Sequence, residues 1–248
     1  MKKLQLDALS FSYDDRPILS DVTLHVKEGE VVALLGPSGV GKTTLFNLIA
    51  GSIPLQQGKI QIDGAQHDKG RVSYMLQKDL LLEHKTVLSN IALPLLIRGI
   101  TRSAAHNQAR KLLEEFHLAH VSCSYPHQLS GGMRQRIAFL RTYCFGHDFF
   151  LLDEAFSALD EWTKTTLHEW YLAAKERLGL TTLLITHSIE EAITLSDRIY
   201  ILNEQPGRIT AELTIDIDPH KDRELQILAY KRQIRTLLGL HNRPATEE

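Results

Sequence analysis

The segment Gly36-Pro37-Ser38-Gly39-Val40-Gly41-Lys42-Thr43 constrains the fold of this chain more than any other. It follows a continuous apolar run at residues 31–35, which is typical of a strand buried on both faces. Residues 44–50 then carry apolar side chains at helical spacing. Glycines between a buried strand and a helix let backbone N–H groups turn towards a phosphate, and the helix N-terminus adds partial positive charge. The segment therefore predicts a phosphate-binding loop.

The last two residues of this loop are predicted to contact a nucleoside triphosphate and its metal. We expect Lys42 to reach the β- and γ-phosphates and the Thr43 hydroxyl to ligate Mg²⁺. The alternative is a glycine turn that matches the pattern by chance, on the order of one in a hundred for this length at average residue usage. The position between a strand and a helix lowers that chance further.

Two carboxylates follow a second apolar run, at residues 149–152. Parallel sheets bind ligands at the carboxyl ends of their strands, where the phosphate loop also lies. We therefore expect Asp153 to hold Mg²⁺ and Glu154 to polarise an attacking water. An apolar strand that ends in two acids is usually structural when it occurs alone, but the phosphate loop in the same chain favours the functional interpretation.

A third element, Ser130-Gly131-Gly132, stands at the start of a predicted helix. Ser130 is a natural N-cap, and the two glycines leave backbone N–H groups exposed. We interpret it as a second anion site. The alternative is a flexible helix start with Arg134 and Arg136 on a solvated face.

The order of strand and helix patterns predicts an α/β fold. Alternating residues 4–9 and 22–26 indicate N-terminal strands, and residues 181–186 and 199–202 indicate later ones. Helical patterns at 162–178 and 189–195 separate the later strands, so we expect a mostly parallel sheet. Strand runs disappear from about residue 78 to 141, which predicts an inserted helical segment.

Composition excludes several classes of protein. The chain has 248 residues, of which 43% are hydrophobic, so a disordered, collagen-like or disulfide-scaffold protein is excluded. A net charge of -2 gives no basic excess for nucleic-acid binding. The longest apolar run, residues 91–97, is too short to span a membrane and contains Pro94. No signal peptide follows Lys2 and Lys3, and Cys123 and Cys144 suggest a reducing compartment, so we expect a soluble, cytoplasmic chain.

These elements together resemble the ATP-binding subunits of ATP-binding cassette (ABC) transporters over nearly all of residues 1–205. Residues 129–135 are similar to the signature motif of the family, with Met133 where glutamine is commoner. Other positions carry the resemblance in family order: Tyr13 for the aromatic that stacks on adenine, Gln77 for the residue that senses the γ-phosphate and Mg²⁺, residues 157–160 for the loop that crosses between paired subunits, and His187 for the switch histidine.

The resemblance implies an α/β P-loop NTPase core with a mostly parallel sheet, an N-terminal antiparallel β part and an inserted helical subdomain. It implies that two copies pair head to tail, with each ATP between Gly36–Thr44 of one copy and Ser130–Gly132 of the other. Glu154, His187 and Gln77 would be catalytic. Nucleotide would be bound by Tyr13, Gly36, Pro37, Ser38, Gly39, Val40, Gly41, Lys42, Thr43, Thr44, Ser130, Gly131 and Gly132, and Mg²⁺ by Thr43, Gln77 and Asp153.

The same resemblance implies the organisation and partners of the chain. Residues 1–205 would be the nucleotide-binding domain, with the helical subdomain at about 78–141 and a short C-terminal extension at 206–248. Partners would be a second copy, transmembrane permease subunits and, indirectly, a solute-binding protein, with no nucleic acid. The protein would lie on the cytoplasmic face of the cell membrane.

Details of the motifs resemble importer subunits for nitrate, sulfonate or taurine, a group that includes carriers of thiamine pyrimidine precursors. Residues 125–136, 155–160 and 206–209 carry this likeness. Ala155 departs from the pattern, because proline is usual there and would stiffen the turn before Ser157. We therefore expect hydrolysis to survive but the rigidity of the Asp160 loop to differ.

Other ATPase classes remain as alternatives. ABC ATPases that act on DNA share the motifs but separate them by long coiled coils, which this chain lacks. Ribosome-acting ABC ATPases normally carry two cassettes in one chain. A P-loop kinase, or a regulatory module that binds nucleotide without turnover, would not need Glu154.

Overall fold

The computed structural model describes residues 2–66, 71–157 and 159–240. The chain divides into two compact units, which we call the first unit (Met1–Arg71 with Gly179–Glu248) and the second unit (Val72–Leu178). The functional boundaries at residues 78, 141 and 205 stay a prediction.

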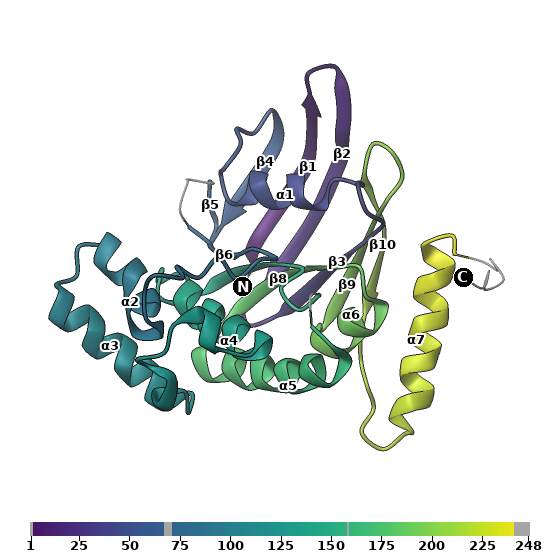
Figure 1. The fold of residues 1–248 in the computed structure, drawn as a ribbon. Coiled ribbons are helices and arrows are strands. Elements are labelled where there is room, and N and C mark those ends of the chain that lie inside the picture. Colours follow the sequence, from purple (N-terminus) through teal and green to yellow (C-terminus); the bar gives the residue numbers. More distant parts are fainter. Residues whose placement is uncertain (1, 67–70, 158, 241–248) are drawn as a thin grey trace. The chain divides into compact units, whose positions relative to one another are not determined.

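The first unit contains an antiparallel sheet (Figure 1). Its strands follow the order β2-β1-β4-β5, with bounds Arg16–Lys27, Lys2–Tyr13, Gln57–Ile62 and Ala65–Gln66. Leu4 and Leu6 on β1 are fully buried, as the alternating pattern predicts. The N-terminal antiparallel β part is confirmed.

The first unit also contains a mainly parallel sheet in the order β10-β9-β3-β8. β3 (Val31–Leu35) pairs in parallel with β8 (Thr181–Thr186) and β9 (Arg198–Asn203), and every residue of β3 and β8 is buried. Continuous apolar runs suit such strands because neither face meets water. β10 (Arg208–Thr214) adds an antiparallel edge that the sequence did not predict, within the expected C-terminal extension.

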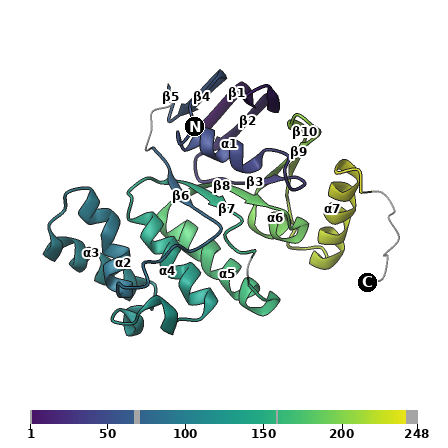
Figure 2. The same ribbon diagram turned by 45° about the horizontal axis from the view of Figure 1, so that its top comes forward.

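The described residues of the first unit include three helices, which Figure 2 labels. They are α1 (Lys42–Ile49), α6 (Ile189–Leu195) and α7 (Arg223–Leu237). α6 contacts β3 and β8, and α7 contacts α6. α7 lies within the expected C-terminal extension.

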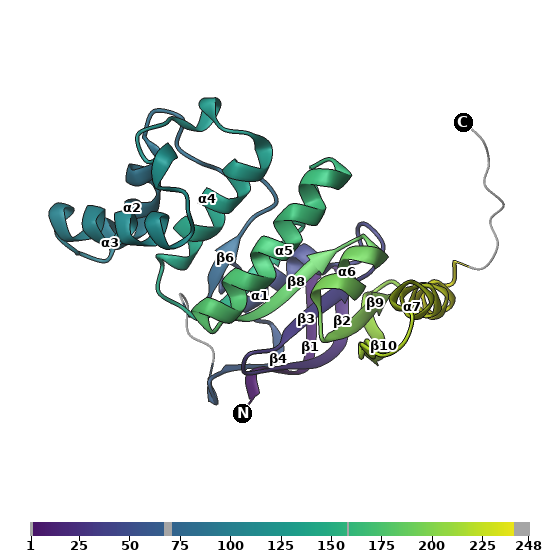
Figure 3. The ribbon, with the colours of Figure 1, turned by 90° about the horizontal axis from the view of Figure 1, so that it is seen from below.

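The second unit is mainly helical, as its labelled helices in Figure 3 show, and it contains a parallel strand pair. β6 (Ser73–Met75) pairs with β7 (Phe149–Asp153). The helices are α2 (Val87–Ile97), α3 (Arg102–Glu115), α4 (Gly131–Tyr143) and α5 (Glu161–Leu178). Residues 78–141 hold no strand in the structure, as the predicted helical insertion requires, and the bounds of that insertion stay a prediction.

Among the residues that the structure describes, no helix is both long enough and apolar enough to cross a membrane. α2, which contains the longest apolar run, has only 11 residues and includes Pro94. Both cysteines are free thiols, of which Cys144 is buried and Cys123 is exposed.

Candidate functional site

The predicted phosphate loop connects β3 to α1 in the first unit, as the sequence indicates. Gly41 is the N-cap of α1, and its φ of 109° lies in the left-handed region that glycine tolerates. A Cβ on Gly41 would approach Leu19 Cδ2 to 2.7 Å, so a larger residue would also clash. No side chain caps the first turn of α1, which leaves its backbone N–H groups to a bound anion.

Lys42 is held against the loop that precedes it. Its side chain is buried, and Nζ donates to the carbonyl oxygens of Gly36 at 2.7 Å and Pro37 at 2.8 Å. Thr43 is exposed at the start of α1, and Thr44 is half-buried beside it. The ammonium group therefore lies inside the loop where a phosphate would be bound, with the Thr43 hydroxyl at its rim.

His187 lies at the same edge of the sheet as the phosphate loop. Leu35 at the end of β3 is the register partner of Thr186 at the end of β8, so the next residues, Gly36 and His187, leave the sheet together. The carboxyl edge of a parallel sheet is where such folds bind ligands. Pro37, Ser38 and His187 line one cavity of about 290 Å³.

Tyr13 lies at the end of β1, where the turn into β2 begins. Its ring is 47% exposed and contacts Phe11 edge-on, with ring centroids 4.9 Å apart. Ile18 and Leu19, a few residues further along β2, are the side chains that approach Gly41. The structure thus attaches the Tyr13 hairpin to the phosphate loop, with an aromatic face free of the core.

Asp153 lies at the end of β7 in the second unit and is only 8% exposed. It accepts a hydrogen bond from the Tyr74 hydroxyl at 3.1 Å. Burial, together with the nearby Asp153 carboxylate, raises the pKa of Tyr74 above its usual range. The phenol is therefore protonated and donates to Asp153, and sequence reasoning missed this role because the register of β6 on β7 creates it.

Glu154 follows at the turn after β7, with a left-handed φ of 47° that is strained for a residue with a side chain. Gln77 Nε2 donates to Glu154 Oε2 at 3.3 Å and to Ser157 Oγ at 3.3 Å. Ser157 Oγ in turn donates to the Glu154 carbonyl oxygen at 2.9 Å. The structure therefore brings Gln77 and Glu154 together, although the sequence separates them by a long helical segment.

The turn that contains Ala155 is held by packing. Ala155 is fully buried, and the next residue, Phe156, packs against His168 and Tyr171 of α5. Asp160 Oδ1 accepts from the backbone N–H of Thr163 at 3.0 Å and so caps α5. Ala158, in the same loop, lies outside the described residues. The expected change in loop rigidity stays a prediction.

Ser130 is the N-cap of α4, as predicted, and its Oγ accepts from the backbone N–H of Met133 at 3.3 Å. Gly132 is the second residue of that helix, and a Cβ there would approach Thr163 Cγ2 to 2.8 Å. A Cβ on Gly131 would approach Leu159 Cδ2 to 3.0 Å. The two glycines therefore let the start of α4 lie close to the Asp160 loop.

Arg134 is not on a solvated face. It forms a bidentate pair with Asp79, with Nε to Oδ2 at 2.8 Å, and a second ion pair with Glu83 at 2.8 Å. Arg141 donates to the carbonyl oxygens of Asp79 and Leu80. Two arginines of α4 thus hold the segment that follows Gln77, a role that no sequence pattern showed because the partners are about fifty residues away.

The residues predicted for the site therefore form two groups. The first unit carries Tyr13, residues 36–44 and His187, and the second carries Gln77, Ser130, Gly131, Gly132, Asp153 and Glu154. The action of both groups on one nucleotide stays a prediction. The donors suit Mg²⁺: a buried carboxylate and an exposed hydroxyl are hard oxygen ligands, and this ion usually takes one or two protein carboxylates and completes its shell with phosphates and water.

Comparison with known proteins gives a consistent result. A family model described as ABC transporter matches residues 19–157. The formylaminopyrimidine import ATP-binding protein ThiZ of Halalkalibacterium halodurans is 39% identical over 242 residues, which cover 95% of this chain and 96% of ThiZ. The taurine import ATP-binding protein TauB of Escherichia coli (strain K12) is 37% identical over 218 residues, covering 86% and 84%.

Solved structures share the fold. The cbiO1 protein of Clostridium perfringens, described as part of the ABC transporter complex cbiONQ, aligns with a TM-score of 0.79 at 21% identity, covering 97% of this chain and 95% of that one. An ATP-binding subunit of an ABC transporter aligns with a TM-score of 0.71 at 27% identity, covering 92% and 99%. The predicted α/β fold is confirmed.

Proposed function

The chain belongs to the ABC transporter family of ATP-binding proteins, and from this we propose how its residues bind and hydrolyse ATP to drive import through a separate permease. The single observation that supports the catalytic assignment is the hydrogen bond from Gln77 to Glu154, directly after the buried Asp153. Members of the family named as import ATP-binding proteins hydrolyse ATP, and this chain is an importer ATPase.

Each residue has a distinct part in the proposed reaction. The backbone N–H groups of residues 36–43 and the Lys42 ammonium bind the phosphates, and Tyr13 stacks on the adenine. Glu154 accepts a proton from the attacking water, while Gln77 orients that carboxylate. His187 donates to the γ-phosphate from the same sheet edge as the loop.

Mg²⁺ would be held by the Thr43 hydroxyl, Asp153 and Gln77. When bound, it would neutralise charge on the β- and γ-phosphates. Tyr74 keeps the Asp153 carboxylate oriented through its hydroxyl. A carboxylate that is already buried and oriented reorganises little when it takes up the ion.

We assign the second anion site to a second copy of the chain. Ser130, Gly131 and Gly132 would contact the γ-phosphate of an ATP bound by residues 36–44 of the partner. Hydrolysis would then remove the bridging charge and release the pair. The close packing of Gly132 on Thr163 supports this use, because it keeps the start of α4 and the Asp160 loop on one surface of the second unit.

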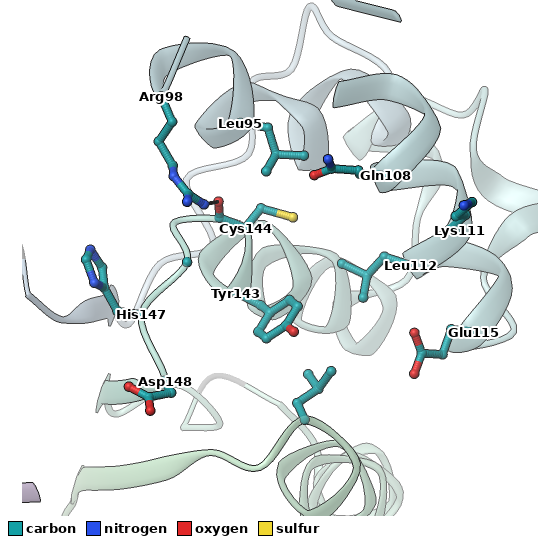
Figure 4. A pocket seen from close by; sticks show the side chains of 12 residues that line it. Leu95, Arg98, Gln108, Lys111, Leu112, Glu115, Tyr143, Cys144, His147 and Asp148 are labelled. Carbon is teal, nitrogen blue, oxygen red and sulfur yellow. Dashed lines mark hydrogen bonds between the residues drawn. The ribbon is translucent and has the colours of Figure 1, made fainter. Parts of the chain in front are cut away.

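A groove in the second unit suits a short helix of the permease (Figure 4). The groove has a volume of about 480 Å³, and Leu95, Leu112 and the buried Cys144 line its apolar part. Burial raises the pKa of the Cys144 thiol to about 12, so this side chain is neutral. Lys111 and Glu115 of α3 add charged side chains to the lining. Amphipathic helices lay their apolar face into apolar grooves of this kind.

The names of the relatives suggest the cargo class. Both formylaminopyrimidine and taurine are small polar solutes, so we propose a small solute delivered by a separate solute-binding protein. The chain would work at the cytoplasmic face of the cell membrane. An ABC ATPase that acts on DNA or ribosomes is the alternative, and co-purification with the permease rather than with nucleic acid would decide against it.

The Glu154→Gln variant tests the catalytic assignment. We expect ATP binding to persist, turnover to be abolished and an ATP-bound dimer to accumulate, because the amide cannot accept the proton of water. Phosphate release and light scattering after size exclusion measure these effects. Glu169→Gln, an exposed change on α5, is the matched control. Hydrolysis by Glu154→Gln at the parent rate would show that the base lies elsewhere.

The Lys111→Glu variant tests the permease groove. Reversing a rim charge should weaken association with the permease in reconstituted membranes and leave the ATPase rate of the isolated chain unchanged. Arg110→Glu, an exposed change on the same helix outside the groove, provides the control. If both variants lost association with the permease equally, the charge of the α3 surface and not this groove would determine the association.

A further inference from the structure

The C-terminal helix α7 contacts α6 and shares an ion pair with it. Ile234, near the end of α7, is fully buried although most of this helix is exposed. Lys231 Nζ lies 2.7 Å from Glu190 Oε2 on α6. Within the first unit, the contact of α7 with α6 is therefore accompanied by one ion pair and by one fully buried side chain on α7.

α6 begins immediately after His187. Ser188 is the N-cap, and its Oγ accepts from the backbone N–H of Glu191 at 3.2 Å. The backbone N–H of Ser188 donates to Thr186 Oγ1 at 3.0 Å, so the peptide on either side of His187 is tied to β8 and α6. A displacement of α6 would therefore displace His187.

The end of α7 also reaches the neighbourhood of the phosphate loop. Leu238 and Leu240 line the cavity of about 290 Å³ that Pro37, Ser38 and His187 share. The C-terminal extension is thus connected to His187 in two ways. α7 contacts α6, which begins directly after His187, and Leu238 and Leu240 line the same cavity as His187.

We infer that α7 is a positioning element for His187, with Ile234 as the residue that carries most of the effect. This inference rests on the proposed role of His187 in hydrolysis. ATP binding depends mainly on the phosphate loop, whereas turnover depends on where His187 lies relative to the γ-phosphate. A misplacement of about 1 Å can cost on the order of a hundredfold in rate.

The experiment compares three variants in the full chain. Ile234→Ala removes the buried contact, Ile234→Val retains most of it, and Leu225→Ala changes a 66% exposed residue on the same helix. We expect kcat for ATP hydrolysis to fall about tenfold in Ile234→Ala, with the affinity for ATP unchanged. Ile234→Val should recover most of the rate, and Leu225→Ala should equal the parent.

The NMR signal of the His187 imidazole distinguishes a local displacement of His187 from a general loss of stability. Its Cε1–H resonance, assigned by its loss in His187→Ala, should shift in folded Ile234→Ala and stay unchanged in Leu225→Ala. Unchanged kcat and an unchanged resonance in Ile234→Ala would overturn the inference. A loss of ATP affinity equal to the loss of kcat would also overturn it.

Exchanging the charges of Lys231 and Glu190 tests the same inference without changing a buried side chain. Lys231→Glu should lower kcat, and adding Glu190→Lys should restore it because the ion pair is rebuilt in reverse; no restoration would count against the inference. Full turnover in His187→Ala would instead refute the proposed role of His187. Loss of turnover in His187→Ala with no effect of α7 variants would refute only the inference.

Discussion

Asp153 shows how a hydrogen bond can stabilise a buried carboxylate. A carboxylate that is 8% exposed costs free energy unless hydrogen bonds and charges compensate it. The Tyr74 hydroxyl supplies one such bond, and it can do so at all physiological pH values because its pKa is raised by burial and by Asp153 itself. Tyr74 therefore acts on Asp153 and not on the nucleotide.

The Tyr74→Phe variant should raise the Mg²⁺ concentration needed for half-maximal ATP hydrolysis by about tenfold or more, as loss of a group that orients a metal ligand typically does. Nucleotide binding without Mg²⁺ should be unchanged. Magnesium titrations of the ATPase rate measure the effect. Tyr125→Phe, a change at an exposed tyrosine, is the control. An unchanged titration would show that Asp153 does not hold the ion.

At the scale of elements, a buried arginine joins four segments of the first unit. Arg198 at the start of β9 makes a bidentate pair with Glu30, with both distances 2.9 Å. It also donates to Glu212 of β10 and to the backbone oxygen of His25 on β2. Arginine suits this position because its planar fork can serve several acceptors at once.

His25 makes this network sensitive to pH. Its Nε2 lies 3.0 Å from Arg198 Nη1, a contact that requires the neutral ring as acceptor. Burial, then the charges of Arg198 and Lys2, lowers the pKa of His25, while Glu212 and Glu30 oppose the shift. The unfolded chain therefore takes up a proton first as the pH falls below about 6.5, so acid in that range destabilises the fold.

The His25→Gln variant should flatten the pH dependence of stability, because the amide oxygen can accept from Arg198 and cannot titrate. We expect the free energy of unfolding of the parent to fall relative to that of the variant as the pH decreases from about 6.5. Urea unfolding at pH 7.5, 6.5 and 5.5 measures it. Parallel curves for both proteins would show that His25 does not contribute.

On the scale of the whole molecule, ATP binding is linked to unfolding. A ligand that binds only the folded state stabilises it by about 2.7 kcal/mol at a hundred times its dissociation constant. Lys42 should control most of this effect, since its ammonium lies inside the phosphate loop. The stabilisation thus reports on the loop without requiring turnover.

The Lys42→Ala variant should lose most of the ATP-induced stabilisation in thermal unfolding, measured with EDTA present to prevent hydrolysis. Lys59→Ala, an exposed change on β4, should keep it. The removed Nζ also releases its bonds to Gly36 and Pro37, so the variant without ATP is measured as its own baseline. An equal rise in melting temperature in both variants would refute the phosphate-loop assignment.

Several elements were predictable from local patterns alone. β8 and α6 have the predicted bounds, and β3 and β7 lie at the predicted buried runs, because continuous apolar runs and helical spacing are properties of neighbouring residues. Ser130 was recognisable as an N-cap for the same reason. β10 was missed although Ile209, Ala211 and Leu213 alternate with polar residues, and only its antiparallel pairing with β9 shows that it is an edge strand.

The sequence by itself determined the phosphate loop, the two carboxylates and the α/β order of strands and helices, since each depends on short-range spacing. Only the tertiary structure decided that Tyr74 donates to Asp153, that Gln77 reaches Glu154 and that α7 packs on α6. These contacts join residues that are tens of positions apart. Strand pairing and helix packing create them, and both bring together residues that local spacing does not relate.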